Sequence, residues 1–95
     1  MEESNTYKEM ETDIKKLEEN IAYCQQNCDQ EAGMKNMDMA RMYEKDVKDL
    51  TDILNCTNEG DFKLAWSVID SVDTAVREEI PTRLYNFIAK KNGYV

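Results

Sequence analysis

The strongest constraint on the fold is a seven-residue hydrophobic repeat near the N-terminus. Its apolar residues alternate three and four positions apart, and they are Tyr7, Met10, Ile14, Leu17, Ile21, Cys24 and Cys28. This spacing forms one narrow stripe along a helix, and such a stripe needs a partner helix to cover it. Because the flanking positions are polar, the repeat predicts a long amphipathic helix that packs against one or two neighbours.

The ends of this first helix are predicted from capping signals. Thr6 and Glu9 have the spacing of a capping box, in which each side chain accepts a backbone N–H at the helix start. Gly33 can adopt the left-handed conformation that often ends a helix. We therefore expect a helix over about 6–31, followed by a turn within about 30–36.

A second helix is expected over about 36–56, antiparallel to the first. It repeats the three–four spacing, with a stripe formed by Ala40, Tyr43, Val47, Leu50 and Leu54. Further apolar residues widen this face, namely Met34, Met37, Met39, Met42 and Ile53. The methionines are interpreted chiefly as core side chains packed where the turn meets the third helix. The alternative is an adaptable surface for a partner, and Met42 favours it because it points away from the stripe.

The C-terminal part is expected to form helices over about 61–80 and 81–92. Asp61 suits the N-cap of the third helix, whose apolar side chains are Phe62, Leu64, Ala65, Trp66, Val68, Ile69, Val72, Ala75 and Val76. Because this is the most apolar helix, we expect it at the centre of the core, with Trp66 as its largest anchor. Pro81 either begins a fourth helix or kinks a continuous one.

Together these patterns predict an all-α fold. We expect one domain over 1–95, a small bundle of three to four helices built on a long antiparallel helical hairpin. Only three glycines and one proline occur, which favours long helices over short strands. The covering helices are short relative to the hairpin, so part of the hairpin is expected to stay bare. A homodimer that covers it is one hypothesis.

The residue types present argue against catalysis. The chain has no histidine, which excludes Ser–His–Asp and Cys–His nucleophilic systems and the usual zinc sites with histidine ligands. No glycine-rich phosphate loop or calcium loop occurs. Paired carboxylates occur at Asp46 and Asp49 and at Glu78 and Glu79, but such pairs are expected by chance in so acidic a chain. We therefore expect no enzyme activity, no cofactor and no metal site.

The three cysteines are expected to be free thiols. Cys24 and Cys28 share one helix face, but in the predicted hairpin Cys56 lies about 21 Å from Cys24 along the axis, at 1.5 Å per residue. A disulfide needs α-carbons within about 7 Å. We interpret the cysteines as small apolar side chains in a reducing compartment, with a redox-sensitive thiol or an intermolecular bridge as the alternative.

The charge is concentrated in the first helix. Of the net −8, residues 1–32 carry nine acidic and three basic side chains, a net −6. This argues against direct binding to nucleic-acid phosphate or to an anionic membrane, since both need a basic face. No stretch is long and apolar enough to span a membrane, and residues 1–5 lack the features of a secretory signal. We expect a cytoplasmic protein.

These exclusions leave binding as the expected function. The first hypothesis is a non-catalytic protein–protein interaction module, a small adaptor or inhibitor that occupies a partner protein. A phage or mobile element that blocks a host enzyme is one expected source of such a small acidic domain, which is a prior expectation and not an inference from residues. The second hypothesis is an acidic mimic of nucleic acid that blocks the basic cleft of a nucleic-acid-binding protein. The third is an oligomeric bundle that holds a small ligand.

The candidate contact residues come from two groups. The acidic side chains of the first helix would serve the mimic, and exposed apolar side chains would serve a protein interface. The acidic candidates are Glu9, Glu11, Asp13, Glu18 and Glu19, and the apolar candidates are Tyr23, Met42 and Tyr94.

Overall fold

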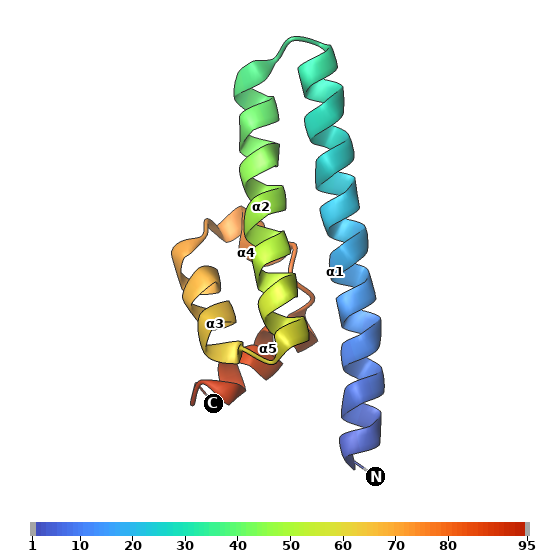
Figure 1. Cartoon of the computed structure of the whole chain (residues 1–95), viewed down its shortest axis with the longest axis vertical. Helices are drawn as coiled ribbons and strands as arrows, with labels where there is room; N and C mark the ends of the chain where they lie inside the picture. Colours follow the sequence, from blue (N-terminus) through green and yellow to red (C-terminus); the bar gives the residue numbers. More distant parts are fainter. Residues whose placement is uncertain (1, 95) are drawn as a thin grey trace.

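The protein folds as a long helical hairpin with three shorter helices packed on one end (Figure 1). The computed structural model describes residues 2–94, and side chains from Met10 to Tyr94. In this part of the chain there are five helices and no strand; they are α1 (Glu2–Gly33), α2 (Met37–Glu59), α3 (Phe62–Ser71), α4 (Thr74–Glu78) and α5 (Thr82–Lys91). The predicted all-α bundle on a hairpin is confirmed.

The hairpin forms as the two apolar stripes predict, but its ends differ from the prediction. α1 begins at Glu2, so Thr6 lies inside the helix and not at its N-cap, and the side chains of the proposed capping box lie outside the described residues. At the turn it is Lys35, with φ 62°, that adopts the left-handed conformation in place of Gly33. The N–H groups of Lys35 and Asn36 bond to Ala32 and Glu31, which is the Schellman pattern that closes a helix.

The expected helix over 61–80 is wrong, because the chain is extended at Val72 and Asp73. Asp73 opens a new helix, since its carbonyl accepts the N–H groups of Val76 and Arg77. The Arg77 guanidinium donates back to the carbonyls of Ile69 and Asp70, at 2.9 and 3.0 Å, and so satisfies the end of α3. Residues 61–92 therefore form three helices.

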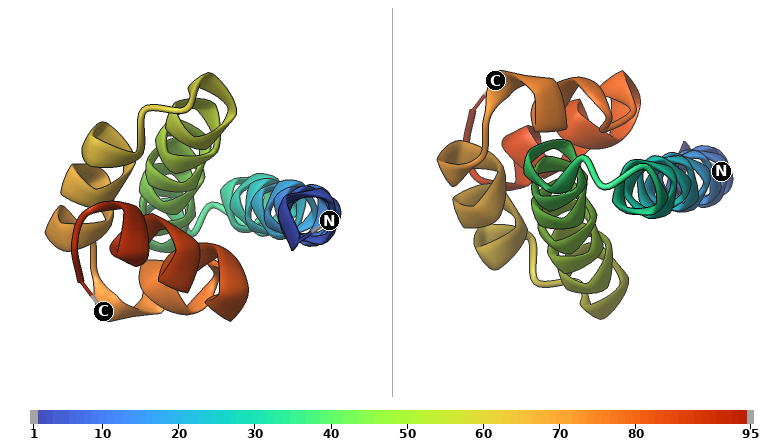
Figure 2. Two further views of the ribbon diagram at one scale, coloured as in Figure 1. Left: turned by 90° about the horizontal axis from the view of Figure 1, so that it is seen from below. Right: turned by 90° about the horizontal axis from the view of Figure 1, so that it is seen from above.

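The core lies where α3, α4 and α5 cover the half of the hairpin remote from its turn (Figures 1 and 2). α2 is the central element, since it packs against α1, α3 and α4, whereas we expected the third helix at the centre. The largest fully buried side chains are Leu17, Leu50, Ile53, Ile69, Val76, Leu84 and Ile88. Leu64 and Ala75, which the sequence placed on the apolar face of the third helix, are exposed.

The other half of the hairpin projects beyond the C-terminal helices as two bare helices (Figure 1). It gives the molecule its elongated shape, with principal dimensions of 51 × 23 × 19 Å. α3 begins at the end of α2 opposite the turn and ends after ten residues, at Ser71, so it does not reach the methionines there. Met34 and Met37 are consequently exposed, and the expectation that they fill the core is wrong.

Candidate protein-interaction surface

The acidic candidates on α1 do not form one surface. Glu11, Glu18 and Glu19 are exposed, but Asp13 is buried, with 8% of its surface accessible. It lies one turn before the buried Leu17 and faces the bundle, where its Oδ2 is 3.9 Å from Nε of Arg83 on α5. Asp13 is therefore a structural residue and not an accessible contact.

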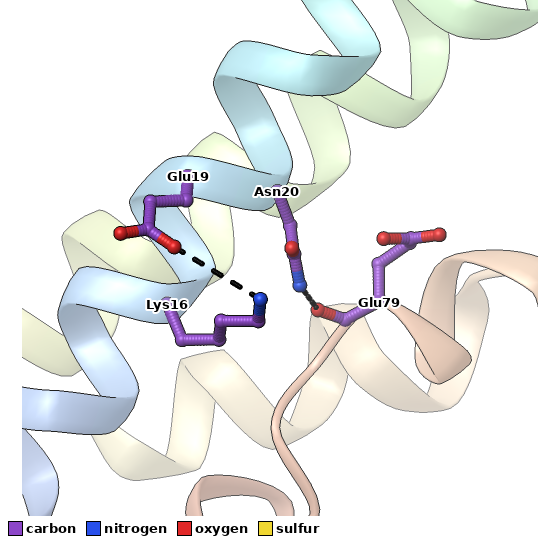
Figure 3. A network of polar contacts seen from close by, with 4 residues as sticks. All are labelled: Lys16, Glu19, Asn20 and Glu79. Atoms are coloured by element: carbon purple, nitrogen blue, oxygen red, sulfur yellow. Dashed lines mark hydrogen bonds and ion pairs between the residues drawn. The ribbon is translucent and has the colours of Figure 1, made fainter.

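Lysines interrupt the remaining acidic side chains. Lys15 and Lys16 are exposed between Glu11 and Glu18, and Lys16 Nζ lies 3.9 Å from Glu19 Oε2 (Figure 3). The side chain of Glu9 lies outside the described residues. A nucleic-acid mimic needs carboxylates in rows without intervening cations, and α1 does not present such a row between residues 10 and 33.

A stability measurement separates these roles. Asp13→Ala is expected to lower the free energy of unfolding by about 1 kcal/mol, because it removes the carboxylate that lies beside Arg83 and leaves a buried position partly empty. Glu18→Ala is expected to change it by less than about 0.5 kcal/mol, since the side chain is exposed. Chemical unfolding followed by circular dichroism measures both values, and equal effects would contradict the buried role of Asp13.

Exposed apolar side chains gather on the projecting half of the hairpin. Tyr23 on α1 and Met42 on α2 are 63% and 61% exposed, as the sequence suggested. Met34 and Met37 at the turn add to them, and the spacing of the repeat alone did not single them out. The signal that could have found them was the short length of the C-terminal segment, which cannot cover a hairpin of this length.

Tyr23 and Met42 lie on the side of the hairpin that carries the C-terminal helices. Asn20 donates from its side chain to the carbonyl of Glu79 at 2.7 Å, which marks that side of α1 (Figure 3). Tyr23 follows Asn20 by three positions, so it lies one turn further along nearly the same face. Met42 precedes Asp46 by four positions, so the two side chains share one face of α2. The charge of Asp73, in the α3–α4 connection, raises the pKa of Asp46, which marks this face as the one that carries the C-terminal helices.

Asp46 lies at the boundary between the bare and the covered halves of α2. Burial raises the pKa of its carboxyl group, and the neighbouring carboxylates of Asp49 and Asp73 raise it further, while Lys45 acts in the opposite direction. Within the described residues none of these three aspartates forms an ion pair. The site therefore combines apolar side chains with carboxylates that Lys45 offsets only in part and that form no ion pair in the described part of the chain.

Tyr94, the third apolar candidate, packs back onto the bundle. Gly93, with φ 84°, closes α5 with a second Schellman pattern in which the N–H of Tyr94 bonds to Ala89. The Tyr94 ring then stacks on Trp66 with centroids 5.1 Å apart. Tyr94 remains 56% exposed, but it lies beside α3, away from the projecting half of the hairpin.

The three cysteines are free, as expected from the geometry of the hairpin. Burial raises the pKa of each thiol, and nearby carboxylates add to the effect; for Cys24 they are those of Glu79 and Asp46. Cys28 also donates its S–H to the carbonyl of Ala40 at 3.3 Å across the hairpin. The thiolate is the reactive form, so these positions are poorly suited to redox or nucleophilic chemistry at neutral pH.

Alkylation tests this assignment. At pH 7.4 we expect iodoacetamide to modify the folded chain at least about tenfold more slowly than the chain unfolded in guanidinium. Burial limits access of the reagent to the thiols, and the raised pKa values lower the fraction of each thiol that is ionised. Reactivity should rise with pH only in the alkaline range, and Cys28, which is half-buried, should react first. Equal rates in the folded and unfolded states, followed by mass spectrometry, would contradict the assignment.

Two surface depressions offer little to a small ligand. One of about 350 Å³ is lined by Thr74, Arg77, Glu78, Ile80, Thr82 and Tyr85. Its cation, Arg77, already donates to the end of α3. The other, of about 490 Å³, is lined by Val47 and charged side chains of α2.

Metal and membrane chemistry find no support in the described part of the chain. No group of three or more cysteine, aspartate or glutamate side chains there is arranged to hold a metal ion. Among the helices of residues 2–94, none is both long and apolar enough to cross a bilayer.

Comparison with known proteins adds no relative: no family model, no curated protein and no solved structure matches this chain.

Proposed function

We propose that this protein is a non-catalytic interaction module that binds and occupies a partner protein, as an adaptor or an inhibitor. The bare half of the hairpin, defined by Tyr23, Met34, Met37 and Met42, is its contact surface. The observation that carries the proposal is that these four large apolar side chains are each at least half-exposed on the part of the hairpin that the C-terminal helices leave uncovered. Exposed apolar patches of this kind are typical of protein interfaces, and methionine side chains adapt to different partner shapes.

The acidic-mimic hypothesis is less well supported. In the proposed row of acidic side chains, Asp13 is buried against the bundle, and Lys15 and Lys16 interrupt the others. The two depressions described above are open to solvent and give the small-ligand hypothesis little support. The capture experiment below also tests the mimic hypothesis, whereas the small-ligand hypothesis predicts a thermal shift with nucleotides or metabolites.

The test is affinity capture from a lysate of the cells that produce the chain. We expect the wild-type chain to retain a protein that the double variant Tyr23→Glu, Met42→Glu loses by about tenfold or more, because it places charge on the apolar surface. Leu64→Glu is the matched control, since Leu64 is also exposed and apolar but lies on α3. Circular dichroism checks that all variants are folded.

Three outcomes would contradict the proposal. Retention of the same protein by the double variant would exclude the bare half of the hairpin as the contact surface. A basic protein lost at high salt, and lost on Glu11→Lys and Glu18→Lys but not on the double variant, would favour the mimic. Capture of a second copy of the chain alone would make the surface a dimer interface.

A further inference from the structure

α2 carries a second stripe besides the one that faces α1. Met42, Asp46, Asp49, Ile53 and Cys56 follow one another at spacings of four and three positions, so they lie along one face. Ile53 and Cys56 are buried in the core with the C-terminal helices, whereas Met42 is largely exposed. The bare surface thus continues an interface that α3, α4 and α5 already use, which indicates that another helix can pack there in the same way.

The size of this surface favours a short helix over a second copy of the chain. The bare part of α2, residues 37–46, is about 15 Å long at 1.5 Å per residue. Two helices side by side form a face about 20 Å wide, since each is about 10 Å across, so this surface measures about 300 Å². That is well below the roughly 800 Å² per partner that a stable dimer buries. A single helix of about three turns matches the length.

The charge at the inner end of the surface specifies the partner further. Asp46 and Asp49 are half-buried and lie one turn apart on α2, the charge of Asp73 at the start of α4 acts on Asp46, and Lys45 is the neighbouring cation. Like charges held together in a partly buried place are unfavourable, and a cation brought by a partner would relieve them. An acidic or neutral helix would not reduce the repulsion between these carboxylates.

We infer that the bare half of the hairpin binds a short amphipathic helix of a partner protein, whose apolar side chains pack on Met39, Met42 and Tyr23 and whose lysine or arginine lies against Asp46, Asp49 and Asp73. This inference rests on the proposed function, and it adds the chemistry of the partner. It follows the general mode in which an amphipathic helix lays its apolar face on a hydrophobic groove.

Two synthetic peptides of about four turns test the inference. They share a leucine face, and their polar faces carry only lysine or only glutamate. Fluorescence anisotropy with a labelled peptide is expected to show binding of the lysine peptide and at least about tenfold weaker binding of the glutamate peptide. Backbone amide shifts in NMR spectra are expected to change around Tyr23, Met39 and Met42.

Matched charge variants separate this site from general attraction to an acidic protein. Asp46→Asn with Asp49→Asn is expected to weaken binding of the lysine peptide by about tenfold, whereas Glu11→Asn with Glu18→Asn changes it by about twofold or less. Both pairs remove two charges. The first pair is also expected to raise the melting temperature, because it relieves repulsion, so weaker binding would not reflect unfolding.

Several outcomes would overturn the inference. They are equal binding of the two peptides, equal effects of the two charge variants, shifts centred outside the bare half of the hairpin, and no binding of the lysine peptide. If Tyr23→Glu with Met42→Glu abolishes capture of a cellular protein but the Asp46 and Asp49 changes do not, the proposed function stands and the inference fails. If neither changes capture, both fail.

Discussion

Leu50→Ala is expected to lower the free energy of unfolding by about 3 kcal/mol, within the 2–5 kcal/mol typical of such a change in a well-packed core. Leu50 is fully buried on α2 in the cluster that joins both long helices to the C-terminal ones. Removing its side chain loses apolar burial and leaves a cavity that neighbouring helices fill only in part. Thermal unfolding followed by circular dichroism should show a decrease of more than about 10 °C in melting temperature.

Leu64→Ala is the matched control, because it removes the same atoms from a helix position that is 51% exposed. Its expected effect is less than about 1 kcal/mol, since Leu64 packs against little. Equal effects of the two substitutions would mean that Leu50 is not central to the core. A larger effect at Leu64 would mean that α3 is turned with its other face inward.

Trp66→Ala is expected to lower the free energy of unfolding by about 2–3 kcal/mol, less than the 3–5 kcal/mol of a fully buried aromatic. Trp66 is only half-buried, and its ring contacts Tyr85 and Tyr94 with centroid distances of 5.5 and 5.1 Å. The substitution removes both ring contacts, so it loosens α5 and the end of the chain together. Urea unfolding measures the change.

Tyr94→Ala provides the comparison for Trp66. It removes one stacking partner and is expected to cost about 0.5–1.5 kcal/mol. Trp66 is the only tryptophan, so its fluorescence reports directly on this site. The emission of the variant should shift to longer wavelength as the indole becomes more exposed, and unchanged emission would contradict the observed stacking.

Helical spacing predicted the hairpin well, because a seven-residue repeat leaves few other arrangements. The stripe through Leu17 and Cys24, and the one through Ala40 and Leu50, face each other as expected. The break at Val72 and Asp73 was missed because both sides of it keep the same apolar spacing. The break is stabilised by hydrogen bonds from the Arg77 guanidinium to the carbonyls at the end of α3, and the apolar spacing does not predict those bonds.

The candidate site was predicted only in part, since exposure depends on what the rest of the chain covers. Tyr23 and Met42 could be identified because they lie off the predicted stripes. Asp13 could not be separated from the exposed acids, because its place against Arg83 depends on where α5 packs. Met34 and Met37 are expected in the core because a helix over 61–80 would be about 30 Å long and would reach back towards the turn, whereas α3 ends at Ser71.

Photo-crosslinking in the producing cells tests the central claim, that the bare half of the hairpin contacts a partner protein. A photoreactive phenylalanine derivative replaces Met42 in one variant and Leu64 in another; both positions are exposed and apolar, on different parts of the molecule. We expect irradiation to yield a discrete heavier adduct from position 42 and none from position 64. An adduct from position 64 with none from position 42 would place the contact surface on α3 and contradict the proposal.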